Sequence, residues 1–197
     1  LPGGGARAAT ALKKLLREIE RQILADGGHI SRSPAATLAA IKDLLTVRSA
    51  LMVANRDTPY LLQSALDRLG PILRMFRHKD GRLALFNGAD ESSAAEIDTA
   101  LALADTKGAA LMNAPHSGYY RLAAEDTLII ADAGAPPPGP FSRCAHAGTL
   151  SFELSVGDHR VIVNCGPGSA SGPEGQDAND WSTASRATAA HSTLVAD

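Results

Sequence analysis

The stretch from Thr149 to Asn164 decides the fold class of this chain, and it reads Thr149-Leu-Ser-Phe-Glu-Leu-Ser-Val-Gly-Asp-His-Arg-Val-Ile-Val-Asn164. Apolar and polar residues alternate over 149–156, which predicts a half-buried strand with Leu150, Phe152, Leu154 and Val156 on its buried face. Gly157-Asp158 predicts a tight turn into a second strand, and so an antiparallel hairpin. A third strand is expected in the run from Arg186 to Val195.

Three polar side chains flank these strands. His146 precedes the first strand, Asn164 closes the second, and His191 enters the third. If they converge on one point, two imidazoles and one oxygen suit a metal such as zinc, with a fourth position for water or substrate. The alternative is ordinary hydrogen-bonded side chains, because separations of 18 and 27 residues are set by the fold and not by a motif.

The first hundred residues predict helices. Leucine and isoleucine recur at helical spacing over three runs: 12–23, 38–51 and 61–69. Ser33-Pro34 and Thr58-Pro59 are helix start signals, and Ser93-Ala-Ala-Glu96 is a capping box. Gly70-Pro71 is expected to kink or divide the third helix, since proline removes a backbone hydrogen bond.

The spacing of apolar residues changes from the helical to the strand period near residue 113. Leu128-Ile129-Ile130 predicts a short buried strand, and the segment 166–184, rich in Gly, Ser, Asp and Pro, predicts a loop that is functional or disordered. The sequence therefore predicts an α+β chain of two domains, a helical part at 1–113 followed by an antiparallel sheet at 114–197.

Composition indicates a soluble globular protein, with 45% hydrophobic residues and no apolar run of the ~20 residues that a transmembrane helix needs. Residues 1–100 carry a net charge of +3 and residues 101–197 a net charge of −5. The basic half suits an anionic ligand, or consists of ordinary solvated helix faces. The sequence contains no phosphate-binding glycine loop, CxxC pair or GxSxG elbow, which argues against nucleotide chemistry, zinc ribbons and serine hydrolases. No nucleic-acid partner is expected.

The remaining cysteines and histidines give weaker signals. Cys144 and Cys165 each adjoin a predicted strand, so either a disulfide or two buried free thiols is expected. His78 and His159 are expected at the surface, on a helix end and in the hairpin turn.

A second candidate site lies where the helical part meets the sheet. The imidazole of His116 and the phenol of Tyr119 are suited to acid–base work in a cleft between domains, and the alternative is aromatic packing at that interface. Arg32, close to the run Asp26-Gly-Gly-His29, either contacts a carboxylate or covers the start of a helix.

Several motifs, taken in this order, resemble the heparinase II/III-like polysaccharide lyases. They are Asp26-Gly-Gly-His29 with Ser33-Pro34, Cys144-Ala-His146 through Phe152, Val163-Asn-Cys-Gly166, and Arg186 through Thr193. The likeness covers most of the chain. It implies the last helices of an incomplete (α/α) toroid followed by the first strands of an antiparallel β-sandwich.

The resemblance also implies a chemistry. Such lyases cleave uronic-acid-containing glycans by β-elimination, in which a base removes the C5 proton and an acid, commonly tyrosine, protonates the leaving oxygen. A structural zinc is implied at His146 and His191, with Asn164 in place of the usual aspartate. The chain departs from the pattern at two further positions, because Ala36 replaces the usual tyrosine and Cys144 replaces the first, often catalytic, histidine.

These departures leave His116 and Tyr119 as the catalytic candidates, with substrate contacts expected from Arg32, Trp181 and Arg186. The favoured hypothesis is a lyase of the bacterial periplasm or cell envelope that acts on an anionic polysaccharide. The chain begins with Leu1 and resembles a piece of a longer polypeptide. The alternative is a catalytically lapsed glycan-binding or envelope-structural protein of the same fold. A third hypothesis, a helical scaffold with an unrelated sheet, requires the motif order to be a coincidence.

Overall fold

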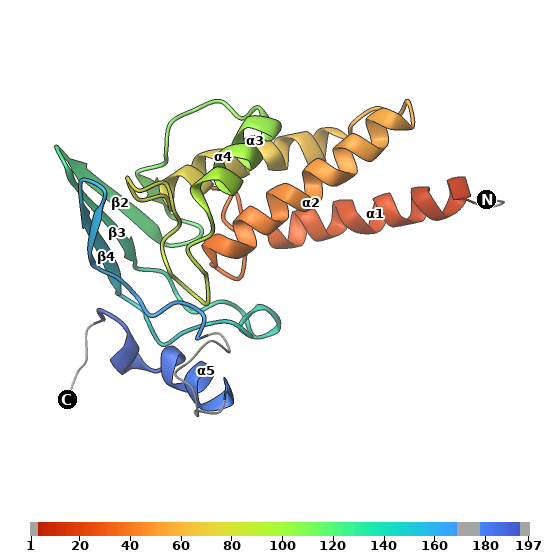
Figure 1. Cartoon of the computed structure of the whole chain (residues 1–197). Coiled ribbons are helices and arrows are strands. Elements are labelled where there is room, and N and C mark those ends of the chain that lie inside the picture. Colours follow the sequence, from red (N-terminus) through yellow and green to blue (C-terminus); the bar gives the residue numbers. More distant parts are fainter. Residues whose placement is uncertain (1–3, 169–177, 194–197) are drawn as a thin grey trace.

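The computed structural model describes residues 4–168 and 178–193, and it consists of a helical part followed by an antiparallel sheet (Figure 1). The helices are α1 (Gly4–Gln22), α2 (Pro34–Val53), α3 (Tyr60–Met75), α4 (Ala94–Ala104) and, after the sheet, α5 (Ala178–Arg186). The strands are β1 (Asn113–Ala114), β2 (Tyr119–Ala124), β3 (Thr127–Asp132), β4 (Phe152–Val156) and β5 (His159–Ile162). The predicted α+β class is confirmed.

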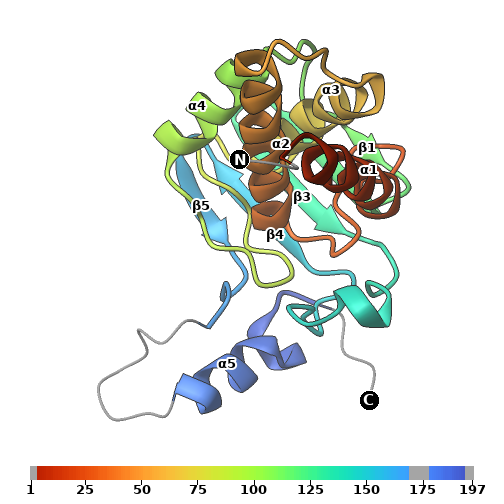
Figure 2. The same cartoon turned by 90° about the vertical axis from the view of Figure 1, so that its right-hand side faces the viewer.

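The first four helices lie on one face of the sheet, and α5 lies apart from them, beyond one end of the strands (Figures 1 and 2). Helix α1 extends away from the body of the molecule. The last of these four helices, α4, ends at Ala104, and the first strand begins at Asn113, close to the expected boundary. The helical core continues into the sheet through Tyr119, Leu128 and Ile130, and the division into two domains stays a prediction.

Helix α3 forms the centre of the helical core because its apolar side chains face three neighbouring elements. The side chains with no exposed surface include Leu62, Leu66, Leu69, Ile72 and Leu73. Gly70 permits close packing, since a Cβ atom there would lie 2.0 Å from the Thr106 hydroxyl. Pro71 lies inside α3, so the helix is not divided there, and the kink expected as the alternative stays a prediction.

The helix start signals have mixed outcomes. Ser93 caps α4 as predicted, because its hydroxyl accepts a hydrogen bond from the Glu96 amide at 3.1 Å. Ser33 precedes α2 but makes no side-chain capping bond, and α3 begins at Tyr60 with Pro59 in the capping position. Proline geometry, more than side-chain capping, therefore sets the beginning of these two helices.

The sheet is an antiparallel meander in the order β1-β2-β3-β4-β5. The predicted hairpin at Gly157-Asp158 is confirmed, since β4 pairs with β5 across that turn. The expected strand beginning at His191 is not formed over residues 191–193, and residues 194–197 lie outside the described part of the chain. Part of the predicted loop 166–184 is helix α5, and residues 169–177 are also outside that part.

The two faces of β4 are reversed relative to the prediction. The polar residues Ser151, Glu153 and Ser155, at and before β4, are almost completely buried against the helical part. Leu150 is 53% exposed and Val156 45% exposed, with further apolar side chains of the outer face on β2 and β5 at Tyr120, Leu122 and Val161. A sheet that is apolar on its outer face and packed on its inner face fits between two layers, as in a sandwich.

Candidate functional site at the helix–sheet junction

Arg32 joins the start of α2 to the sheet. Its buried guanidinium donates from Nε to the Ser117 carbonyl (2.8 Å), from Nη1 to the carbonyls of Gly134 and Ala135 (3.2 and 2.8 Å), and from Nη2 to the Asp132 carboxylate. Burial raises the pKa of Asp132, and the nearby Arg32 charge opposes that rise. Arg32 thus contacts a carboxylate of the protein itself, and a substrate contact from it stays a prediction.

Tyr119 belongs to the same set of contacts, which we call the Arg32 network (Arg32, Asn87, Tyr119 and Asp132). The Tyr119 side chain is fully buried, and its hydroxyl donates to the Arg32 carbonyl (2.6 Å) and accepts from Asn87 Nδ2 (3.0 Å). Burial raises the pKa of Tyr119 well above its ordinary value. The ring packs edge-on against Phe76, with centroids 4.8 Å apart, so the structure shows the packing alternative for this residue.

His116 lies elsewhere, exposed on the loop before β2. It lines a cleft of about 360 Å³ together with Arg32, Gly134 and the run 136–138. Tyr119 does not line this cleft. The expected imidazole–phenol pair is therefore not formed, because the strand alternation that exposes Tyr120 turns Tyr119 toward the core.

A second buried cluster, the Glu153 network, consists of His78, Glu153, Ser155 and Asn164. The Glu153 side chain has no exposed surface. Its Oε2 accepts from His78 Nε2 at 2.9 Å, and its Oε1 accepts from the Leu85 amide (2.8 Å) and the Asn164 amide (3.2 Å). The Nδ1 atom of His78 is 2.9 Å from the Ser155 hydroxyl. The prediction of a surface position for His78 is wrong, because its partners come from β4, more than 70 residues later.

The structure brings His146, Asn164 and His191 together at the far side of the Glu153 network. The rings of His146 and His191, the histidine pair, have centroids 5.2 Å apart with an interplanar angle of 57°. Asn164 Oδ1 lies 2.9 Å from His191 Nδ1, and the His146 amide donates to Asn87 Oδ1 at 3.4 Å. Two ring nitrogens, His146 Nδ1 and His191 Nε2, are buried without a hydrogen-bond partner.

Burial dominates the electrostatics of the histidine pair. It lowers the pKa of His146 to about 4, with further lowering from His191 and the Arg186 charge. Burial also lowers the pKa of His191, against opposing effects of the Ser185 backbone and the carboxylates of Asp132 and Glu153. Both rings are therefore neutral near pH 7 and offer nitrogen lone pairs, which can accept a proton, a hydrogen bond or a cation.

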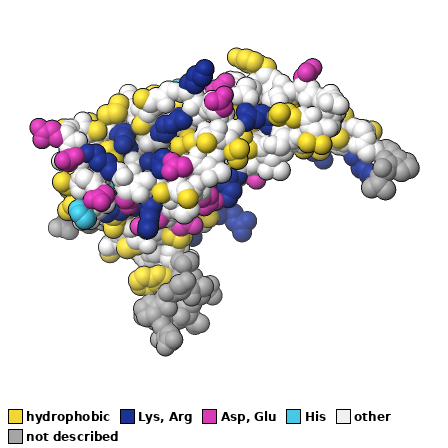
Figure 3. All heavy atoms as spheres, turned by 45° about the horizontal axis from the view of Figure 1, so that its top comes forward, with side chains coloured by type: hydrophobic (Ala, Val, Ile, Leu, Met, Phe, Trp, Pro, Cys, Tyr) yellow, Lys and Arg dark blue, Asp and Glu magenta, His cyan; other side chains and the backbone are white. Residues whose placement is uncertain are grey.

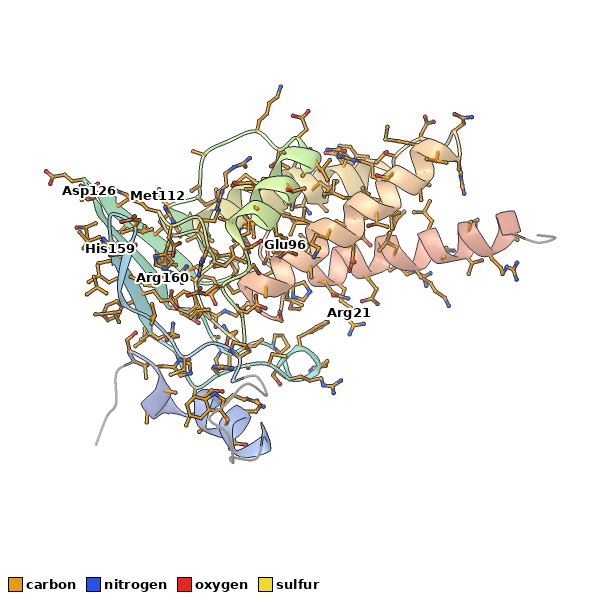
Figure 4. All side chains as sticks on the ribbon, viewed as in Figure 1. Arg21, Glu96, Met112, Asp126, His159 and Arg160 are labelled. Carbon is orange, nitrogen blue, oxygen red and sulfur yellow. The ribbon has the colours of Figure 1, made fainter. Side chains whose placement is uncertain are left out.

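The other expected site residues lie around α5. Trp181 is 38% exposed and lines a small pocket with Cys165, while Arg186 donates from Nε to the Ala145 carbonyl at 3.0 Å. Cys144 and Cys165 are free and exposed, so both a disulfide and buried thiols are excluded. His159 is exposed as predicted, at the outer edge of the sheet, whereas Arg160 lies further toward the helices (Figure 4).

The structure adds Asn87, Gly88, Asp132 and Glu153 to the site. Asn87 and Gly88 both have positive φ angles, 48° and 71°, and a Cβ on Gly88 would lie 3.0 Å from the Cys144 carbonyl oxygen. The Asn-Gly dipeptide is a turn signal in the sequence, but nothing local shows that this turn packs against residues 144–146. Asp132 and Glu153 carry no local sign of burial, because their partners are distant in sequence.

The described residues show no other feature that names a function directly. Within 4–168 and 178–193, no group of three or more His, Cys, Asp or Glu side chains is placed to hold a metal ion. None of the helices in this part of the chain is long and apolar enough to cross a membrane. Acidic and basic side chains are interspersed over the face shown in Figure 3.

The structure has helices packed on an antiparallel sheet, with a polar junction between them and a histidine pair. This α+β arrangement is the one expected for a protein that joins a helical toroid to a β-sandwich. Residues 106–197 match the heparinase II/III-like C-terminal family model. The resemblance found in the sequence is confirmed.

The chain is also similar to individual known proteins. FtsZ-localized protein C of Caulobacter vibrioides is 41% identical over 156 residues, which cover 79% of this chain and 27% of that protein. A heparinase III structure has a TM-score of 0.75 at 15% identity and covers 97% of this chain. Heparan sulfate lyase HepC from Pedobacter heparinus has a TM-score of 0.68 at 22% identity over 92% of this chain. The chain spans 27% of the curated relative and about a third of each lyase, and the lyase structures show the fold alone.

Proposed function

We propose that the full-length protein is a binding or envelope-structural member of the heparinase II/III fold that does not carry out β-elimination. The observation that carries this proposal is the fully buried Tyr119, whose hydroxyl is bonded to the Arg32 carbonyl and to Asn87. The two positions at which the family resemblance calls for an acid or a base hold Ala36 and Cys144. An acid that protonates a leaving oxygen must reach the substrate, and this phenol does not.

Sequence identity to known proteins also favours a member of the fold without lyase activity. This chain shares 41% identity with a protein named for its localisation with FtsZ, against 15 to 22% with the heparinases. We carry that localisation over and propose that the full-length protein co-localises with FtsZ. Periplasmic or cell-envelope residence, expected from the lyase resemblance, is the competing proposal. Fluorescent fusions imaged together with labelled FtsZ test the first proposal, and release of the protein with the periplasmic fraction tests the second.

An active lyase for uronic-acid-containing anionic glycans is the second candidate. The histidine pair favours it, because neutral imidazoles with lone pairs can accept the C5 proton of a uronate. In this case His116 supplies acid–base chemistry from the adjoining cleft, and Trp181 and Arg186 supply contacts to the glycan. The net charge of +3 on residues 1–100 supports an anionic ligand for either candidate.

A divalent metal such as zinc at the histidine pair is part of the first candidate, because nitrogens bound to a metal have no free lone pair for the C5 proton. Two imidazoles bound at ~2.0–2.1 Å to one tetrahedral zinc have ring centroids about 5 Å apart. The pair has a separation of 5.2 Å and two unpartnered buried nitrogens, which fits two of four ligands. Stoichiometric zinc that is lost in His146→Ala and His191→Ala supports this assignment, and metal-free protein after purification without chelators contradicts it.

The decisive experiment measures glycan binding and elimination on the same full-length protein. A panel of heparan sulfate, other uronate glycans and a neutral glycan is tested by affinity electrophoresis, and the ultraviolet absorbance of the unsaturated uronate product is followed. A heparan sulfate lyase serves as the positive control. Binding of anionic glycans without product supports the first proposal. Product formation overturns it in favour of the lyase. Absence of both binding and product supports a role in localisation that does not involve a glycan.

A further inference from the structure

Asn164 is joined to two groups at once, and this fixes the orientation of its amide. Glu153 Oε1 accepts hydrogen bonds from two backbone amides, those of Leu85 (2.8 Å) and Asn164 (3.2 Å). Backbone N–H groups can only donate, so Oε1 is an acceptor. The Asn164 side-chain atom 3.2 Å from this oxygen must therefore be the donor Nδ2. The amide oxygen of Asn164 then faces His191.

The orientation of the amide decides where His191 carries its proton. Asn164 Oδ1 lies 2.9 Å from His191 Nδ1, and an amide oxygen can only accept. Nδ1 must therefore be protonated. The opposite atom, Nε2, is buried without a hydrogen-bond partner.

We infer that Glu153 and Asn164 act as positioning residues that hold His191 in the Nδ1-protonated tautomer, with Nε2 free as an electron-pair donor beside His146. The site then recognises a cation or a hydrogen-bond donor and disfavours a carboxylate or sulfate. Asn164 supports a metal ligand and is not one itself, which changes its expected role. This inference concerns the site of the proposed function, but it does not require that metal or glycan is bound.

The arrangement of carboxylate, amide and imidazole explains how an asparagine can stand where the resemblance calls for aspartate. Histidine ligands commonly donate their second ring N–H to an oxygen that fixes their tautomer and orientation. Here the amide oxygen takes that role, and the buried Glu153 carboxylate holds the amide. Because Glu153 is also bonded to His78, the tautomer of His191 depends on the integrity of the Glu153 network.

The test is nuclear magnetic resonance of metal-free full-length protein with 15N-labelled histidine rings. The His191 signals are assigned as those absent from His191→Ala. We expect a protonated Nδ1 and an unprotonated Nε2 in the wild type. Asn164→Ala should shift His191 toward the Nε2-protonated form that free imidazoles favour. Asn164→Asp, whose second carboxyl oxygen must share a proton with Glu153 Oε1, keeps an oxygen acceptor for His191 and should keep the wild-type tautomer. Asn113→Ala, at an exposed asparagine, is the matched control.

An Nε2-protonated His191 in the wild type overturns the inference, as does an Asn164→Ala spectrum unchanged from wild type. Cobalt binding adds a second readout. Asn164→Ala should weaken cobalt affinity about 10–100-fold while the visible spectrum of the saturated site keeps its shape. A changed spectrum would show that Asn164 is a ligand and overturn its positioning role. Absence of any metal binding contradicts the proposed metal, while the tautomer measurement still decides the inference.

Discussion

The core around α3 and the junction between helices and sheet are equally buried, but different chemistry holds them. The α3 core consists of leucine and isoleucine side chains whose contribution depends on filled volume. The junction buries Arg32, His78, Asp132, Glu153 and Asn164, whose contribution depends on every donor meeting an acceptor. An apolar core therefore loses stability in proportion to the atoms removed, whereas a buried polar network loses most when one member leaves its partners unpaired.

The comparison predicts that loss of Glu153 has the largest effect. Glu153→Ala removes the acceptor of the His78 ring, the Leu85 amide and the Asn164 amide, and it should lower the free energy of unfolding by about 3–5 kcal/mol. Urea denaturation of the full-length protein measures this change. Glu20→Ala, at an exposed position on α1, is the control. If Glu153→Ala lowers the free energy of unfolding by less than a single leucine truncation does, the Glu153 network does not stabilise the junction as proposed.

Leu66→Ala in the α3 core should have the next largest effect. The Leu66 side chain is completely buried, and its truncation leaves a cavity that costs about 3 kcal/mol. Leu103→Ala, at a 61% exposed position on α4, should change the denaturation midpoint little. Equal effects of the two substitutions would show that the α3 core is not packed as the structure indicates.

These two regions also differ in how far the sequence predicts them. The helical periodicity, the Ser93 capping box and the Gly157-Asp158 hairpin are local signals, and each corresponds to an element of the structure. The burial of His78 and the inward polar face of β4 are not local. They depend on contacts between residues more than 70 positions apart, which the alternation of residue types does not reveal.

The candidate site divides along the same line. The positions of His146, Asn164 and His191 at the ends of expected strands predicted their convergence, which the structure shows although no strand forms at His191. The pairing of His116 with Tyr119 failed, because His116 lies on the exposed turn before β2 whereas Tyr119, the first residue of the strand, faces the core. Asn87 and Glu153 were missed because an Asn-Gly turn and an acidic residue in a strand have many ordinary explanations.

Tyr119→Phe should have a smaller effect than either core truncation. It keeps the ring against Phe76 but removes the hydroxyl that joins the Arg32 carbonyl to Asn87, at a cost of about 1–2 kcal/mol. Tyr120→Phe, at the 41% exposed neighbour, is the matched control. If Tyr119 is an acid catalyst, this substitution abolishes any elimination activity, whereas a structural Tyr119 leaves an existing activity at wild-type kcat.

The smallest effect is expected at the rim of the junction, where the Asp80 carboxylate accepts from Arg160 Nε at 2.8 Å. Burial raises the pKa of Asp80, but hydrogen bonds from Arg160 and the Arg82 amide outweigh it and hold the pKa below the ordinary value of 3.8. A carboxyl group with a lowered folded-state pKa stabilises the fold above its unfolded-state pKa, and this contribution is lost as the pH falls through the folded value. Wild type should therefore be more stable than Asp80→Asn at pH 7.

The stability difference between wild type and Asp80→Asn should shrink below about pH 4 and vanish once Asp80 is protonated. Denaturation midpoints of both proteins across pH 2.5 to 7, at a constant ionic strength, measure it. A difference that does not change with pH would mean that Asp80 acts through its hydrogen-bond geometry and not its charge. At its rim, the junction would then resemble the α3 core, because packing geometry and not charge would decide its stability. Charge would contribute only at the buried carboxylates of Asp132 and Glu153.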